Sequence, residues 1–382
     1  TSTEHAAAIQ LEGTNQRRLL SITSANTSDG GTLLLARQNG DAGTNTVVAN
    51  NNQIGRIDFQ GNDGTNFETA AIISAEIDGT PGDDDMPGRL LFKTTADGAK
   101  AATERLRITS SGKVLIGDDT AENTIGLNAN VQTFGTDAST SSIAIRRGSN
   151  DAQAAFLVMS KSRNTSVGSR TILNNGDEVG NIFFAADDGT DLVSNTAAIK
   201  SQVDGAPGAN DTPGNLSFWT TADGANSAVR RMTIDSNGHV TKPYQFHIEV
   251  DRDSDQTGYN ASANFGTPMI YNRVVRTIGT QNSALDTSTG KITVPVAGVY
   301  FLEATAYATT ASFQQGWFTE GTGRMNYSDH AYDSKTNRIQ TVGMHYLPAN
   351  TEVGYKPYGS GESNVTIGDS VYHTWMRVTL IG

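Results

Sequence analysis

The chain has 382 residues, of which 40 are glycine, none is cysteine and only 36% are hydrophobic. It carries 40 acidic and 28 basic residues, which gives a formal net charge of −12. These numbers exclude a disulfide framework and thiolate metal sites, and they argue against nucleic-acid binding, which needs clustered lysine and arginine. The sequence contains no apolar run of about 20 residues and therefore predicts no membrane insertion.

The first two-thirds of the chain contain a duplicated segment. Three blocks recur in order: GRIDFQGNDGT (55–65) as GNIFFAADDGT (180–190), residues 78–99 as residues 204–225, and residues 104–114 as residues 230–240. The copies are 125 residues apart in the first block and 126 apart in the other two. Such self-similarity is the mark of repeated structural units. The sequence therefore predicts two modules, 1–120 and 121–240.

Each module has the pattern of short strands joined by tight turns. Alternating apolar residues predict strands, and Asp-Gly, Ser-Gly and Asn-Gly pairs predict the turns between them. The apolar positions of module 1 are Ile57, Phe59, Leu90, Phe92, Leu106 and Ile108, and those of module 2 are Ile182, Phe184, Leu216, Phe218, Met232 and Ile234. An all-β fold with a thin core follows for both modules.

A segment near the end of module 1 carries a resemblance. Residues 105–117 read RLRITSSGKVLIG, and this phrase resembles one common in the shafts of phage tail fibres. The resemblance implies a location on the virion tail, outside any cell, and contacts with upstream virion or tail proteins.

The repeat ends at Val240, and residues 241–382 have a different composition, richer in aromatic residues. Residues 270–274 read IYNRV, and residues 285–301 read LDTSTGKITVPVAGVYF. These segments resemble the globular heads of the complement q-subunit family. The resemblance implies a jelly-roll β-sandwich tip domain related to tumour-necrosis-factor heads, assembled as a homotrimer. Ile292, Asn350 and Arg377 depart from the family pattern, so no particular ligand or calcium site is implied.

Two acidic clusters raise the question of calcium. Asp251, Asp253 and Asp255 have the spacing that begins an EF-hand, but the sixth and twelfth positions are Gln256 and Ser262 instead of glycine and glutamate. A solvated turn is therefore favoured there, with a looser Ca²⁺ site as the open alternative. In the run 83–85 only Asp85 has a counterpart in module 2, Asp211, and Asp78 recurs as Asp204. This recurrence fits a turn as well as a cation site, and we favour the turn. We predict no cofactor and no metal.

No motif for catalysis is present. The sequence lacks a G-x-S-x-G elbow, a P-loop and an H-E-x-x-H motif, and the six histidines have no ligand spacing. A glycosidase needs two carboxylates across a groove, and the sequence singles out no such pair. We therefore predict that the protein is not an enzyme.

A group of aromatic residues in the last third forms the candidate ligand-binding set. Aromatic rings stack on sugars, and neighbouring polar groups provide directional hydrogen bonds. The alternative is that these rings fill the sandwich core or a trimer interface; Trp317 and Phe318 are consecutive, so at least one should point inward. The candidates are Trp317, Phe318, Tyr327, His330, Tyr332, Tyr355 and Tyr358.

The sequence as a whole predicts a structural tail-fibre protein that attaches a virion to its host. Its tip would recognise a host cell-surface glycan or protein, and three identical tips would give avidity. Two alternatives stay open: a bacterial surface adhesin of the exosporium type with the same head, and a tail spike that degrades polysaccharide.

Overall fold

The computed structural model describes residues 20–23, 30–262, 268–278, 281–311, 313–320, 323–325, 337–368 and 374–382. These parts of the chain are strands and connections, with one short 3-10 helix at Gln281–Ala284. The predicted all-β class is confirmed. Among these residues, no helix is long and apolar enough to cross a membrane.

The chain divides into two compact units. One comprises residues 1–160 with 183–196, and the other comprises residues 161–182 with 197–382. The division passes through the second sequence repeat. The three-domain organisation into 1–120, 121–240 and 241–382 therefore stays a prediction.

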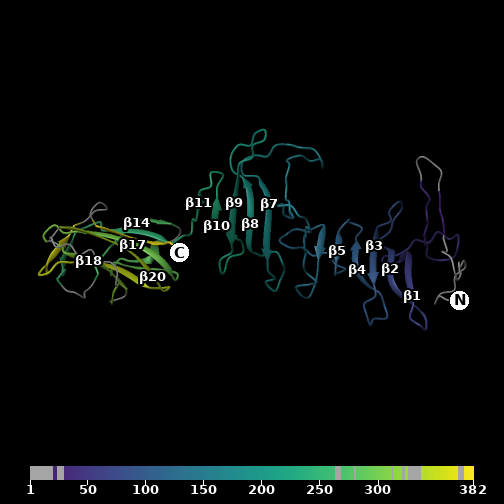
Figure 1. The fold of residues 1–382 in the computed structure, drawn as a ribbon, viewed down its shortest axis with the longest axis horizontal. Helices are drawn as coiled ribbons and strands as arrows, with labels where there is room; N and C mark the ends of the chain where they lie inside the picture. Colours follow the sequence, from purple (N-terminus) through teal and green to yellow (C-terminus); the bar gives the residue numbers. More distant parts are fainter. Residues whose placement is uncertain are drawn as a thin grey trace. The chain divides into compact units, whose positions relative to one another are not determined.

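Module 1 forms a six-stranded sheet in which each strand pairs with the next along the chain (Figure 1). All pairs are antiparallel except the last, which is parallel. The strands are β1 (Gln53–Asn62), β2 (Phe67–Ile77), β3 (Gly88–Thr94), β4 (Thr103–Ile108), β5 (Val114–Ile116) and β6 (Val131–Thr133).

Module 2 forms a five-stranded sheet whose first four strands repeat β1–β4. Its order is β11-β10-β9-β8-β7, so β7 and β11 are the edges. The strands are β7 (Glu178–Ala185), β8 (Asn195–Val203), β9 (Gly214–Thr220), β10 (Val229–Ile234) and β11 (Val240–Thr241).

The connections of the two modules repeat down to single hydrogen bonds. The Ser110 amide donates to Asp78 Oδ2 at 2.8 Å, and the Ser236 amide donates to Asp204 Oδ2 at 2.9 Å. The residue after each of these aspartates is a glycine. Its φ is +148° at Gly79, with a matching value at Gly205 in module 2, and this backbone conformation is unfavourable for residues with a side chain. The sequence repeat is therefore a structural repeat.

One face of each module sheet is a continuous apolar surface. In module 1 the strand register aligns a row across the first five of the six strands: Ile57, Ile73, Phe92, Leu106 and Ile116. At the β1 edge, Phe59 is 51% exposed, and its equivalent in module 2, Phe184, is 50% exposed. A single chain thus leaves matching aromatic rings half in water in both modules.

The last third folds into two five-stranded sheets with a small additional pair. Among the described strands, no neighbours in the first sheet are consecutive in the chain, and two of the four neighbouring pairs in the second are not, as a jelly roll requires, so the predicted sandwich is confirmed. The first sheet contains β14 (Arg273–Ile278), β12 (His247–Asp251), β23 (Trp375–Leu380), β17 (Gly298–Tyr307) and β20 (Arg338–Leu347). The second contains β15 (Leu285–Asp286), β16 (Lys291–Thr293), β21 (Glu352–Tyr358), β18 (Gln315–Glu320) and β19 (Gly323–Arg324). The additional pair is β13 (Gln256–Tyr259) with β22 (Val365–Ile367).

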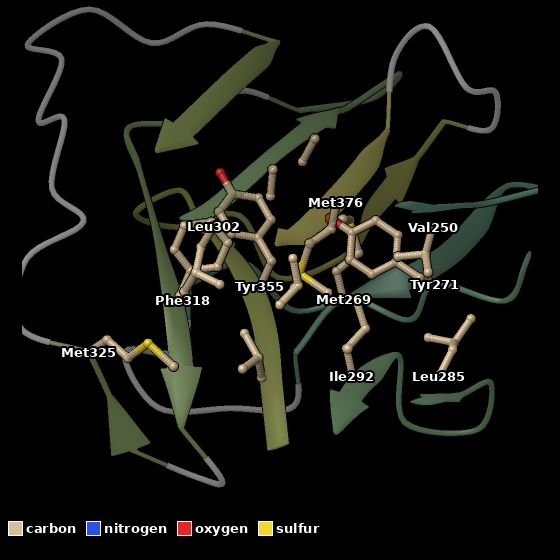
Figure 2. Close-up of a cluster of buried hydrophobic side chains, with 14 of the residues drawn as sticks. Val250, Met269, Tyr271, Leu285, Ile292, Leu302, Phe318, Met325, Tyr355 and Met376 are labelled. Carbon is tan, nitrogen blue, oxygen red and sulfur yellow. The ribbon is translucent and has the colours of Figure 1, made fainter. Parts of the chain in front are cut away.

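The sandwich encloses the main hydrophobic core of the described residues. Val250, Leu302 and Met376 come from the first sheet, and Ile292, Phe318 and Tyr355 come from the second. Figure 2 shows these side chains meeting between the two layers. Alternate side chains of these strands therefore point inward and form the core between the two sheets.

The outer face of the first sheet has an apolar patch beside an ion cluster. Val299 pairs with Tyr346 and Phe301 with Met344, and Met344 and Tyr346 are strongly exposed. Beside them, Arg377 lies 3.3 Å from a carboxylate oxygen of Glu249 and 3.4 Å from one of Glu303. The arginine that departs from the complement-q pattern is thus held by two carboxylates.

Candidate functional site

The candidate aromatic residues gather on one antiparallel pair of strands, β18 and β21. The register places Trp317 opposite Lys356, Phe318 opposite Tyr355, and Thr319 opposite Gly354. Because side chains alternate along a strand, the pair has an inner face on the core and an outer face.

The inner face carries Phe318 and Tyr355. Both are fully buried, and their ring centroids are 5.4 Å apart. The Tyr355 hydroxyl and Thr341 Oγ1 are in hydrogen-bond contact at 2.9 Å, and burial raises the pKa of Tyr355. Neither ring offers a surface to a ligand, so these two candidates are corrected to core residues. Strand alternation turns them inward.

The outer face carries Trp317 and Tyr358. Their ring centroids are 5.6 Å apart, with 36° between the ring planes. Trp317 is buried and Tyr358 is half-buried. The two rings form a tilted aromatic pair that keeps the geometry favoured for aromatic contacts.

Lys356 and Thr319 lie on the same outer face, diagonally across the two strands. Lys356 is only 1% exposed. Within the described part of the chain, neither its Nζ nor Thr319 Oγ1 has a hydrogen-bond partner. Burial lowers the pKa of Lys356, because a charged ammonium is costly away from water. A carboxylate, phosphate or hydroxyl group from a ligand would satisfy both polar atoms.

The glycine opposite Thr319 leaves room for the side chain of Pro268, which packs over this part of the face. A Cβ at Gly354 would lie 2.8 Å from Pro268 Cβ and 2.9 Å from Thr319 Oγ1, which is closer than real contacts allow. Rings, ammonium and hydroxyl therefore lie on one face of two strands. Trp317, Lys356 and Thr319 are buried, so of these four residues only Tyr358 exposes part of its side chain.

Three of the predicted residues, Tyr327, His330 and Tyr332, lie outside the described residues, and their roles stay predictions. Sequence reasoning missed Lys356 and Thr319. The available signal was a lysine between Tyr355 and Pro357 in an apolar strand, but only the register shows that it shares a face with Trp317.

Several of the acidic positions considered for calcium have other partners. Asp251 is fully buried, and its two carboxylate oxygens accept hydrogen bonds from Arg273 at 2.7 and 2.6 Å. Asp253 Oδ1 accepts a hydrogen bond from Asn272 Nδ2 at 2.7 Å. Gly82 and Asp85 exchange backbone hydrogen bonds, as a turn does. Within the described ranges no three His, Cys, Asp or Glu side chains are grouped to hold a metal ion.

The chain matches no protein-family model and no curated protein, but solved structures resemble it. The carboxy-terminal domain of the bacteriophage T5 L-shaped tail fibre with its intra-molecular chaperone domain is 12% identical, with a TM-score of 0.50 over 89% of this chain and 93% of that chain. The fold is similar to that of a tail-fibre domain. The predicted resemblance is confirmed at the level of the fold.

Two further solved structures match parts of the chain. The carboxy-terminal domain of the same T5 fibre is 17% identical, with a TM-score of 0.47 over 59% of this chain and 90% of that chain. The globular domain of the zebrafish complement 1qA protein is 16% identical, with a TM-score of 0.26 over 36% of this chain and 98% of that chain.

Proposed function

We propose that this chain is the distal, receptor-binding part of a homotrimeric virion tail fibre and that it catalyses no reaction. The observation that carries the proposal is the repeated apolar face of the two modules, which a single chain leaves uncovered. The tail-fibre fold supports the same assignment.

The uncovered apolar faces call for self-association. Phe59 and Phe184 are exposed to the same extent at equivalent edges, so the exposed ring is a repeated feature of the module. Covering apolar surface stabilises by about 25 cal/mol per Å², and large uncovered patches mark interfaces. The patch around Met344 and Tyr346 gives the sandwich a surface of the same kind. That three chains associate is inferred from the resemblance to tail-fibre and complement-q proteins.

The outer face of β18 and β21 is the proposed receptor contact. Tyr358, which is half-buried, would contact a sugar ring, and the buried Trp317 would support it, since the two ring centroids are 5.6 Å apart. Lys356 and Thr319 are buried beside this pair. Three weak contacts on one particle raise the effective concentration for each other. A host cell-surface glycan, or a protein that presents such groups, fits this face. Upstream virion or tail proteins would hold the other end of the fibre outside the cell.

The test is the binding of the labelled whole chain to a panel of bacterial strains. Binding to some strains and not to others is expected, and Trp317→Ala with Tyr358→Ala should reduce it at least about tenfold, since stacking contacts each contribute about 1 kcal/mol. Absence of binding to every strain at micromolar concentration would contradict the proposal.

The same samples test the absence of catalysis. Incubation of the chain with surface polysaccharide from a bound strain should release no new reducing ends. Release of oligosaccharide would favour the tail-spike alternative.

A further inference from the structure

A run of consecutive, strongly exposed apolar side chains in module 2 lies in a segment that has no strand. Residues 154–160 read AAFLVMS and form no strand, and Phe156, Leu157 and Val158 are 69%, 72% and 77% exposed. Consecutive side chains of a strand point to opposite faces. This segment therefore has the composition of a strand that is covered on both faces, but in a single chain it is covered on neither.

The backbone of this segment is equally unsatisfied. The described residues form no hydrogen bond with the amides or carbonyls of residues 154–160. Backbone polar groups need partners, and an extended apolar segment of this length with free backbone is prone to uncontrolled pairing. A partner strand would satisfy both requirements together.

Module 1 contains the same feature at the corresponding place. Residues 32–36 read TLLLA, form no strand, and expose Leu34 by 80%. Further along, Asn50 and Asn175 occupy matching positions, since each side chain accepts a hydrogen bond at 3.0 Å from the first loop glycine, Gly79 or Gly205. The unpaired segments therefore precede equivalent parts of both modules, and the feature is duplicated with the fold.

We infer that residues 154–160 and 32–36 become strands when they bind a second copy of this chain. Each segment would pair with the edge strand of a module in that copy and cover its apolar sheet face. We call them the donor segments. The inference rests on the proposed self-association and names the segments that carry it.

The occupant is argued to be a second copy for two reasons. Each module presents both a donor segment and an apolar face that ends in an edge strand, β1 or β7, so one copy provides what another lacks. In module 1, Leu35 of the donor segment already packs against Gly55 of β1 within the same chain, but its backbone has no strand partner there. In addition, duplication places the feature in both modules, as an assembly contact along the whole repeat requires. Addition of a strand to a free edge is an established mode of protein association.

Photo-crosslinking of the whole chain tests the inference. Val158→p-benzoylphenylalanine should yield covalent dimers of the chain on a denaturing gel after illumination. The matched control is the same substitution at Thr165, an exposed position in the following loop, which should yield mostly monomer. Crosslinks confined within one chain at Val158, or equal dimer yields at both positions, would overturn the inference.

Amide exchange provides a second readout that requires no substitution. The amides of residues 154–160 should exchange as slowly as those of β8 in the assembled protein. Exchange at the rate of a free peptide would overturn the inference, because it would show that no second copy of the chain pairs with this segment.

The inference and the proposed function fail in distinguishable ways. If light scattering gives a trimer but Val158 forms no crosslink between chains, the trimer stands and the donor segments are wrong. If light scattering gives a monomer, both fail. Should the variant at Val158 not assemble, Met159→p-benzoylphenylalanine decides between the same two outcomes, since Met159 is less exposed.

Discussion

Asp78 and Asp204 hold the same turn in the two modules, but with different support. Asp78 accepts hydrogen bonds from the Ser110 amide and from Arg89 at 3.3 Å. In module 2 the position of Arg89 is occupied by Asn215. Of the two contacts, Asp204 therefore keeps only the hydrogen bond from the Ser236 amide. The conserved contact is therefore the one to the amide, and the arginine is an addition in module 1.

Replacement of these aspartates should destabilise the turn unequally. Asp204→Ala leaves the Ser236 amide without its acceptor and should lower the free energy of unfolding by about 1–2 kcal/mol. Asp78→Ala also removes the hydrogen bond from Arg89 Nη1 and should cost more. Denaturant unfolding of the whole chain measures both. The control Asp83→Ala, at an exposed position with no counterpart in module 2, should stay within about 0.5 kcal/mol. An effect of Asp204→Ala as small as that of the control would refute the role of the carboxylate.

Replacement of Lys356 should change the free energy of unfolding in the opposite direction. Lys356→Met removes a buried ammonium without a described partner and should raise the free energy of unfolding by about 1–3 kcal/mol, measured by denaturant unfolding. Lys291→Met is the control: Lys291 pairs with Glu352 at 2.8 Å, and its loss should lower stability by under about 1 kcal/mol. A loss of stability in Lys356→Met would show that the lysine already has a structural partner.

The candidate site was only partly predictable at the scale of residues. Alternation indicates that Trp317 and Phe318 face opposite ways, but it does not say which one faces the core. The register with β21 decides this, since Phe318 meets Tyr355. Lys356 was not predictable, because nothing in its neighbourhood signals that both faces of its strand are buried.

The sheet of module 1 is held on its polar face by a charged group around Glu76. Arg89 Nη2 lies 2.7 Å and Lys93 Nζ 3.4 Å from its carboxylate. Burial acts to raise the pKa of Glu76, but the hydrogen bond from Arg89 and the charge of Lys93 outweigh it, so the pKa lies below its ordinary value.

This shift predicts that module 1 loses stability in acid. The folded pKa is lower than the unfolded value of about 4.3, so Glu76 stabilises the fold above that pH, and the contribution is lost as the pH falls through the folded pKa. Thermal unfolding across this range should show a steeper decline for the natural chain than for Glu76→Gln. Identical pH profiles of the two proteins would contradict the assignment.

The apolar edge residues should act on assembly. Phe59→Ser with Phe184→Ser removes half-exposed rings that a neighbouring chain would cover, at a cost of about 1–2 kcal/mol per ring. The midpoint of thermal dissociation should fall. Asn62→Ser, an exposed polar change in the same strand β1, should leave it unchanged. Equal midpoints for all three proteins would show that the apolar face is not an interface.

At the scale of elements, the repeat and its turns made most of the module strands predictable. The Asp-Gly, Ser-Gly and Asn-Gly pairs place the turns, and alternation places Ile57 with Phe59 on one face. The parallel pairing of β5 with β6 was not predictable, because local pattern does not specify strand order. Residues 154–160 have a strand composition without a strand, which is expected where the partner belongs to another chain.

For the whole molecule, the account depends on association. The hydrophobic core of the sandwich is enclosed within one chain, whereas both modules leave an apolar face and a donor segment uncovered. The absence of cysteine removes disulfides as a means of support. Contacts between chains would then add to the few side chains that each module buries by itself, such as Leu91, Leu115 and Val203.

Light scattering of the purified whole chain at micromolar concentration tests this claim most directly. A homotrimer is expected, seen as a single species with three times the chain mass of 40.4 kDa. A stable, folded species of 40.4 kDa, with both modules intact, would contradict it.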